Sequence, residues 1–116
     1  MAAYKLVVLS EPMPGREDEY NRWYNEVHLR EVVATPGFVS AQRFKLNSPM
    51  SGQYPHQYLA IYDVETESAE AVLAALYAAA EPGKMNISTA LNVESAIAGL
   101  FEPISAVVSA SASATA

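Results

Sequence analysis

The sequence has 116 residues, of which 51% are hydrophobic, and its 7 basic and 13 acidic side chains give a formal net charge of −6 at pH 7. This length indicates a single domain with a core of ordinary size. The acidic balance argues against a nucleic-acid partner, because phosphates carry the same sign of charge. The sequence contains no cysteine, which excludes disulfides, thiolate catalysis and zinc–sulfur sites. The apolar run near the N-terminus is too short for a signal core or a membrane span, so we expect a cytoplasmic protein without a membrane partner.

The first half of the chain is predicted to form a strand, a long helix and a second strand. Residues 4–10 are rich in β-branched and aromatic side chains and are followed by two prolines, which predicts a strand that ends there. Residues 15–35 predict a helix, because acidic residues fill its first turn and complement the helix dipole. Pro36 ends this helix, since the residue before a proline is pushed out of the helical region. Residues 38–46 then predict the second strand.

The second half continues with a strand over residues 56–64 and an alanine-rich helix over residues 67–81, which Pro82-Gly83 ends. Residues 85–93 are ambiguous, with a short helix as one reading. A last strand is predicted within residues 96–104, where a proline limits its length.

The predicted order is therefore β-α-β-β-α-β, the pattern of a ferredoxin-like α+β fold with an antiparallel sheet and both helices on one face. We assign residues 1–106 to this domain. Residues 107–116 have nothing to bury, and we expect them to form a flexible Ala/Ser tail.

Both faces of the predicted sheet are apolar. In the third strand Tyr58, Ala60 and Tyr62 share one face, while Leu59 and Ile61 share the other. Two helices cover only one face of such a sheet. The other face either carries some exposed apolar surface, as most proteins do, or packs against a second copy of the chain. The patterning favours the homodimer.

The predicted first helix carries the candidate site. At about 100° per residue its sheet-facing side comprises Tyr20, Trp23, Tyr24, Val27 and Ala34. Glu31 falls near the middle of that side, and polar groups form a strip along its flank: Tyr24, His28, Glu31 and Thr35.

Two readings of His28 compete. In the first it is a structural histidine bonded to a backbone carbonyl, while Glu31 reaches solvent or pairs with Arg30 or Arg43. In the second it lines a cleft between helix and sheet, where an imidazole near its ordinary pKa moves protons at neutral pH and Glu31 or Tyr24 orients it. A carboxylate on a buried face is costly unless it is paired, so Glu31 needs an explanation under either reading.

The segment YNRWYNEVHLREVVATPGFVSAQRF, residues 20–44, resembles the dimeric α+β barrel superfamily, in particular its EthD-like branch. Such proteins have an aromatic-W-x-x-x-x-H helix, a Pro-Gly turn and a strand with an arginine. Here the matching residues are Trp23, His28, Pro36-Gly37 and Arg43. The predicted order of elements agrees over residues 4–104, and GLFEPIS near the end resembles the closing strand of these domains.

The resemblance implies a ferredoxin-like subunit and a homodimer, but not one reaction. The superfamily includes polyketide cyclases, monooxygenases, dehydratases, isomerases and members without an assigned activity. Many of its members have a proline two residues after the histidine, whereas this chain has Leu29-Arg30 after His28. We therefore expect the helix to continue unbroken past His28.

Other candidate residues have a structural and a functional reading. His56 either reaches a pocket mouth or is simply exposed. Tyr54, Tyr58 and Tyr62 share one strand face, where they either pack against a partner sheet or line an aromatic pocket. Arg43 either binds a carboxylate or enolate oxygen or neutralises Glu31. The sequence shows no metal-ligand spacing, phosphate loop, dinucleotide fingerprint or nucleophilic triad.

By elimination, any catalysis would use acid–base groups without a cofactor or metal. Together with the resemblance, this leads us to expect a homodimeric enzyme that acts on a small aromatic or polyketide-like carbonyl compound. The reaction would be a cyclisation, dehydration or isomerisation. His28 is the expected general base or acid, with Glu31 or Tyr24 as its partner. The residues expected to contact the substrate are Trp23, Arg43, Tyr58 and Tyr62. Two alternatives stay open: a cofactor-free monooxygenase, and a non-catalytic protein that binds a small hydrophobic molecule.

Overall fold

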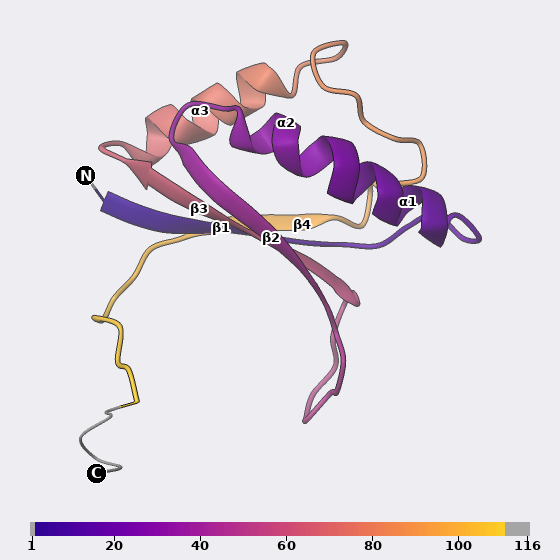
Figure 1. Ribbon diagram of the computed structural model, residues 1–116, viewed down its shortest axis with the longest axis horizontal. Coiled ribbons are helices and arrows are strands. Elements are labelled where there is room, and N and C mark those ends of the chain that lie inside the picture. Colours follow the sequence, from indigo (N-terminus) through magenta and orange to yellow (C-terminus); the bar gives the residue numbers. More distant parts are fainter. Residues whose placement is uncertain (1, 111–116) are drawn as a thin grey trace.

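The structure, a computed structural model, describes residues 2–110. It forms one antiparallel sheet with the helices on a single side (Figure 1). The elements in chain order are β1 (Ala2–Ser10), α1 (Glu17–Trp23), the π-helical segment η1 (Tyr24–His28), α2 (Leu29–Val33), β2 (Phe38–Lys45), β3 (Tyr58–Thr66), α3 (Ala69–Ala79) and β4 (Ile97–Phe101). The predicted β-α-β-β-α-β order is confirmed, with α1, η1 and α2 forming one continuous helical stretch.

The strand order in the sheet is β2-β3-β1-β4. β1 lies in the centre and pairs antiparallel with both β3 and β4, so that Leu6 is opposite Tyr62 on one side and opposite Leu100 on the other. β2 and β3 form an antiparallel hairpin. This is the ferredoxin-like arrangement predicted from the order of elements.

Two elements in the second half of the chain differ from the prediction: the start of α3 and the segment over residues 85–93. α3 begins at Ala69, because the side chain of Ser68 caps it by accepting a hydrogen bond from the N–H of Ala71 at 3.1 Å. Residues 85–93 form no helix. They run as turns, and Leu91 makes a β-bridge with Pro12 that ties this segment to the end of β1.

The π-helical turn in the middle of the first helical stretch changes which residues face the sheet. The N–H of Leu29 bonds to the carbonyl of Tyr24, five residues earlier, so the turn holds one extra residue. The residues after the π turn are therefore rotated about the helix axis relative to their positions in a uniform α-helix. Ala34, predicted to be buried, is exposed, whereas Val32 and Thr35 are buried at about 4% exposure. The expectation for Ala34 is wrong because a uniform 100° per residue does not hold through a π turn.

The two faces of the sheet have different surroundings. The face under the helices is the core: along β3, Tyr58, Ala60, Tyr62 and Val64 are at most 7% exposed. The opposite face, here called the open face, is not covered by the helices (Figure 1). Its exposed large apolar side chains are Phe44, Ile97 and Phe101.

Beyond β4 the described chain runs away from the helical layer, and the tip of the β2–β3 hairpin extends on the same side (Figure 1). Ile104, Val107 and Val108 are more than 90% exposed. Residues 111–116 of the predicted Ala/Ser tail lie outside the described residues. Within residues 2–110, none of the helices has the length and apolar character needed to cross a bilayer.

Candidate functional site

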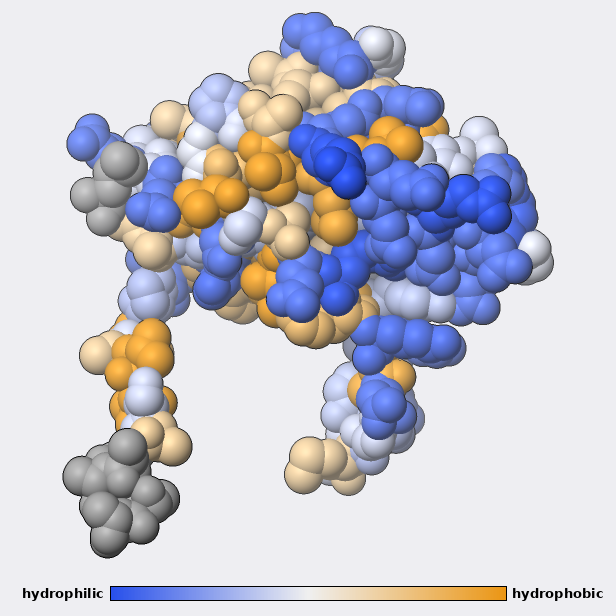
Figure 2. Space-filling view, in the orientation of Figure 1, coloured by the Kyte–Doolittle hydropathy of each residue, from blue (hydrophilic) through white to orange (hydrophobic). Residues whose placement is uncertain are grey.

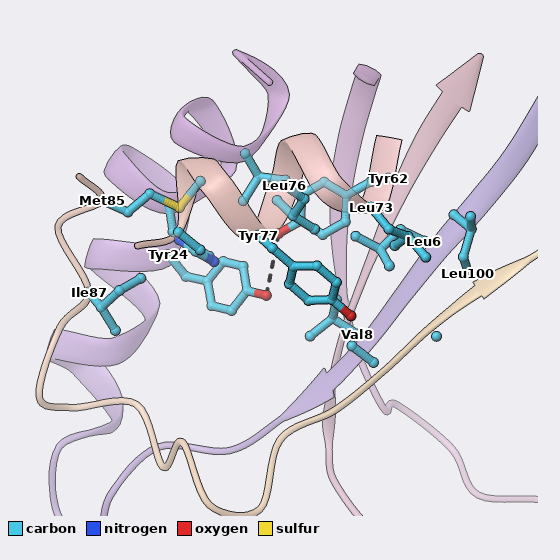
Figure 3. A pocket seen from close by; sticks show the side chains of 15 residues that line it. Leu6, Val8, Tyr24, Tyr62, Leu73, Leu76, Tyr77, Met85, Ile87 and Leu100 are labelled. Carbon is cyan, nitrogen blue, oxygen red and sulfur yellow. Dashed lines mark hydrogen bonds between the residues drawn. The ribbon is translucent and has the colours of Figure 1, made fainter. Parts of the chain in front are cut away.

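A cavity of about 350 Å³ lies between the helices and the covered face of the sheet. Its floor is formed by Leu6, Val8 and Leu100, and α3 contributes Leu73, Leu76 and Tyr77 from the opposite side (Figure 3). Met85 and Ile87, from the segment after α3, close one end. In the space-filling view, apolar side chains gather in the middle of the molecule and polar side chains cover the end around α1 (Figure 2). The cavity is therefore shaped for a small, mainly apolar molecule.

Two tyrosine hydroxyls meet at the cavity wall. Tyr24 comes from the π-helical segment and Tyr62 from β3, and the hydroxyl of Tyr62 donates to that of Tyr24 across 3.4 Å (Figure 3). Burial raises the pKa of both phenols above the ordinary value of 10.0. Both side chains thus stay protonated at neutral pH and act as hydrogen-bond donors.

His28 is the one ionisable side chain of the lining whose pKa is shifted downward. Its ring stacks on Trp23 with centroids 4.6 Å apart, and it meets the edge of Tyr24 at 4.9 Å. Nδ1 is buried without a hydrogen-bond partner among the described residues. Burial lowers the pKa of His28 from 6.5 to about 4, and the opposing effect of Glu31 does not outweigh this. The imidazole is therefore neutral at pH 7, contrary to the expectation of an ordinary pKa.

The π turn explains why His28 reaches the cavity. On a uniform helix it falls on the flank of the sheet-facing side, beside the predicted position of Glu31. The extra residue rotates His28 inward, into line with Val32 and Thr35.

Glu31 and Thr35 do not make the contacts that the polar strip predicts. Glu31 Oε2 accepts the backbone N–H of Asn86 at 3.0 Å, so this carboxylate anchors the segment after α3. Its other oxygen and Thr35 Oγ1 are buried without partners among residues 2–110. Neither Glu31 nor Tyr24 is hydrogen-bonded to His28. The orientation of the imidazole comes from stacking on Trp23 instead.

Arg43 lies on the covered face of the sheet, but outside the cavity lining. Its guanidinium lies 4.3 Å from the centre of the Tyr24 ring and donates to Asn25 Oδ1 at 2.8 Å and Asn21 Oδ1 at 2.9 Å. Pairing with Glu31, one of the two readings of Arg43, is not found, because two asparagines four residues apart accept from the guanidinium beside the ring of Tyr24. Arg43 therefore packs on Tyr24, a residue of the cavity wall, without lining the cavity itself.

The remaining predicted contact residues lie around the cavity at different depths. Trp23 supports His28, and its indole N–H donates to the carbonyl of Asn86 at 2.6 Å. Tyr58 lies outside the lining, and its hydroxyl donates to Glu17. Because Tyr58 and Tyr62 face the helices, the reading that they pack against a partner sheet is wrong. Of the seven predicted site residues, the cavity brings together Tyr24, His28 and Tyr62.

Sequence reasoning missed the opposite wall of the cavity. This wall comprises Leu73, Leu76 and Tyr77 of the predicted alanine-rich helix, and Met85 and Ile87 of the ambiguous segment over residues 85–93. The usable signal was the spacing of three large side chains at neighbouring turns of a helix otherwise rich in alanine. Within residues 2–110, no group of three or more acidic or histidine side chains is placed to hold a metal ion.

Comparison of the sequence with known protein families and with curated proteins finds no match. Solved structures do match. A proposed monooxygenase from Shewanella loihica PV-4 is 17% identical, with a TM-score of 0.55, over 90% of this chain and 97% of its own. The heme-degrading protein MhuD from Mycobacterium tuberculosis, solved with two hemes in its active site, is 19% identical, with a TM-score of 0.60, over 90% of this chain and 99% of its own. At these identities the likeness shows the fold alone.

Proposed function

Because the chain has the fold of the dimeric α+β barrel superfamily and carries a neutral imidazole at an apolar cavity, we propose that it is an enzyme of small aromatic or polyketide-like carbonyl compounds. The reaction class is proton transfer, leading to cyclisation, dehydration or isomerisation. The observation that carries the proposal is the meeting of His28 with two protonated tyrosine hydroxyls in one apolar cavity.

Burial gives each of these groups a distinct role. A neutral His28 is ready to accept a proton from a carbon or hydroxyl next to a carbonyl group. The hydroxyl of Tyr24, which accepts from that of Tyr62, donates its own proton to the oxygen on which negative charge develops. That negative charge, formed beside the ring, stabilises the imidazolium and raises the pKa of His28 as the proton arrives. Such a base contributes roughly 10²–10⁴-fold to a rate.

Trp23 and Arg43 act as positioning residues in this proposal. The stacked indole holds the plane of the imidazole, and the guanidinium behind Tyr24 fixes the ring that carries the donating hydroxyl. Glu31 holds the segment that supplies Met85 and Ile87 to the cavity through its bond to Asn86.

We propose further that two chains associate through the open face of the sheet. Phe44, Ile97 and Phe101 are each more than 40% exposed there, which is unusual for large apolar side chains gathered on one face. A second copy packed face to face would bury them and complete the barrel.

Heme does not fit this cavity well. A heme carries propionate carboxylates, which are best held by cationic side chains, and the lining contains neither lysine nor arginine. Arg43 is the nearest candidate, but Tyr24 lies between it and the cavity and two asparagines occupy its donors.

The test measures proton exchange rather than a specific product. The purified protein is incubated in D₂O with a panel of aromatic 1,3-dicarbonyl compounds, and deuterium uptake at the carbon between the carbonyls is followed by NMR. We expect at least one compound to exchange 10²-fold faster or more with the wild type than with His28→Gln. His56→Gln, at the only other histidine, is the matched control and should keep full activity.

Two results would redirect the assignment. If a product contains an atom from O₂ and the reaction stops under nitrogen, the protein is a monooxygenase. If compounds bind in the cavity but exchange is the same in wild type and His28→Gln, the protein binds its ligand without acid–base catalysis.

A further inference from the structure

A second cavity, of about 510 Å³, lies at the start of β3, outside the site described above. The loop after β1 contributes Glu11 and Met13, the first helix contributes Glu17, and the end of the β2–β3 loop contributes Tyr54 and His56. The lining contains two carboxylates and neither lysine nor arginine. Its charge is therefore negative.

His56 is buried at this cavity, with a side chain only 5% exposed. This corrects the expectation of an exposed loop histidine. Its Nε2 lies 2.7 Å from the carbonyl oxygen of Ser95. A carbonyl oxygen only accepts, so Nε2 carries the proton. In the tautomer with this proton on Nε2, Nδ1 is a lone-pair acceptor, and it is buried without a partner among the described residues.

A carboxylate close to that lone pair is also an acceptor. Glu11 Oε2 lies 3.8 Å from His56 Nδ1, too far for a hydrogen bond between them. Two acceptors that face each other across such a gap are both satisfied by one group that donates several hydrogen bonds and carries positive charge. The neighbouring Tyr54 adds an aromatic face, which attracts cations.

We propose that this second cavity binds a protonated amine, whose N–H groups are shared between Nδ1 of His56 and the carboxylate of Glu11. An ammonium group has three donors on one atom and matches this pair of acceptors. The apolar Met13 and the ring of Tyr54 take the carbon skeleton attached to the amine.

A metal ion matches the same place less well. His56 and Glu11 supply two ligands, and within residues 2–110 no third acidic or histidine side chain joins them in a group able to hold a metal. Structural and catalytic zinc sites use at least three protein ligands. Lys45 and Arg43 lie over the ring of Tyr58 and not in the lining, so they do not occupy the amine position.

The experiment follows the His56 ring nitrogens by long-range ¹H–¹⁵N NMR during titration with benzylamine at pH 7.5. We expect a saturable shift of the Nδ1 resonance, with the Nε2–H resonance retained. Benzyl alcohol, a neutral molecule of the same shape, should cause no saturable shift. Glu11→Gln should weaken benzylamine binding roughly tenfold, because a charge-assisted hydrogen bond is lost. Glu26→Gln, an exposed glutamate far along the first helix, should leave it unchanged.

Further titrations distinguish the possible sources of the amine and test other ligands for the same cavity. N-acetyl-lysine methylamide presents a lysine side chain, and comparison of its affinity with that of benzylamine distinguishes a peptide partner from a small aromatic amine. The proposal is overturned if neither amine shifts Nδ1, if benzyl alcohol binds as tightly as benzylamine, or if Zn²⁺ alone shifts the resonance. None of these readouts depends on His28, so they are independent of the proposed reaction.

Discussion

The lowered pKa of His28 has a direct consequence for stability at acidic pH. In the folded chain burial holds this pKa at about 4, whereas in the unfolded chain the ring titrates near 6.5. Protonation therefore favours the unfolded state. The stabilising contribution is fully present above pH 6.5 and is lost as the pH falls toward 4. Replacing His28 with glutamine removes the titrating group and should remove this loss.

The magnitude follows from the two pKa values of His28. At pH 5 most unfolded rings are protonated and most folded rings are not, which costs about 2 kcal/mol of folding free energy. At pH 4 the cost reaches about 3 kcal/mol, and it changes little below that pH. This is a sizeable fraction of the 5–15 kcal/mol that a typical domain has. The free energy of unfolding should consequently be markedly lower at pH 4.5 than at pH 7.

The assay is urea unfolding at fixed protein concentration, repeated at pH 7, 6, 5 and 4.5, for the wild type, His28→Gln and His56→Gln. All three lose stability from their acidic side chains, so the difference between wild type and variant isolates one ring. We expect the wild type to lose about 2 kcal/mol more than His28→Gln by pH 5. Parallel curves for the wild type and His28→Gln would refute the burial of the imidazole.

Two other changes test the turn after the first helix and the open face. Gly37 has φ +95°, and a Cβ there would lie 2.8 Å from Val72 Cγ2. Gly37→Ala should therefore destabilise by about 2 kcal/mol or more in urea unfolding, and by more than Gly83→Ala, whose added Cβ meets nothing. Phe101→Glu should give a monomer in sedimentation velocity, while Ala74→Glu on exposed α3 should not. A dimeric Phe101→Glu would show that this face is not the interface.

The sequence predicted the sheet and the helices correctly because their patterns are local and repeated. Alternation in residues 56–64 placed the tyrosines of β3 on one face, and Pro36-Gly37 marked the end of the first helix within a few residues. The sequence could not predict which face each set would take, since both faces are apolar. That choice is made by α3 and the first helical stretch together, which are distant in sequence.

The candidate site was predicted less completely, and the π turn is the main reason. One extra residue in that turn moved His28 into the cavity and exposed Ala34, and no residue in the segment 24–28 indicates such a turn by its type. The reading in which Arg43 neutralises Glu31 rests on charge alone, whereas in the structure Asn21 and Asn25 accept from its guanidinium. Amide partners are hard to predict because they leave no charge pattern in the sequence.

Because Trp23 stacks on His28, the intrinsic tryptophan fluorescence of the chain reports on the state of this histidine. The sequence contains a single tryptophan, so all of the indole emission comes from Trp23, the residue stacked on His28. Protonation of the ring, or arrival of an aromatic guest, would alter the brightness and colour of that emission without any added dye. Ligand binding in the cavity and protonation of His28 can thus be followed by the fluorescence of the unlabelled protein.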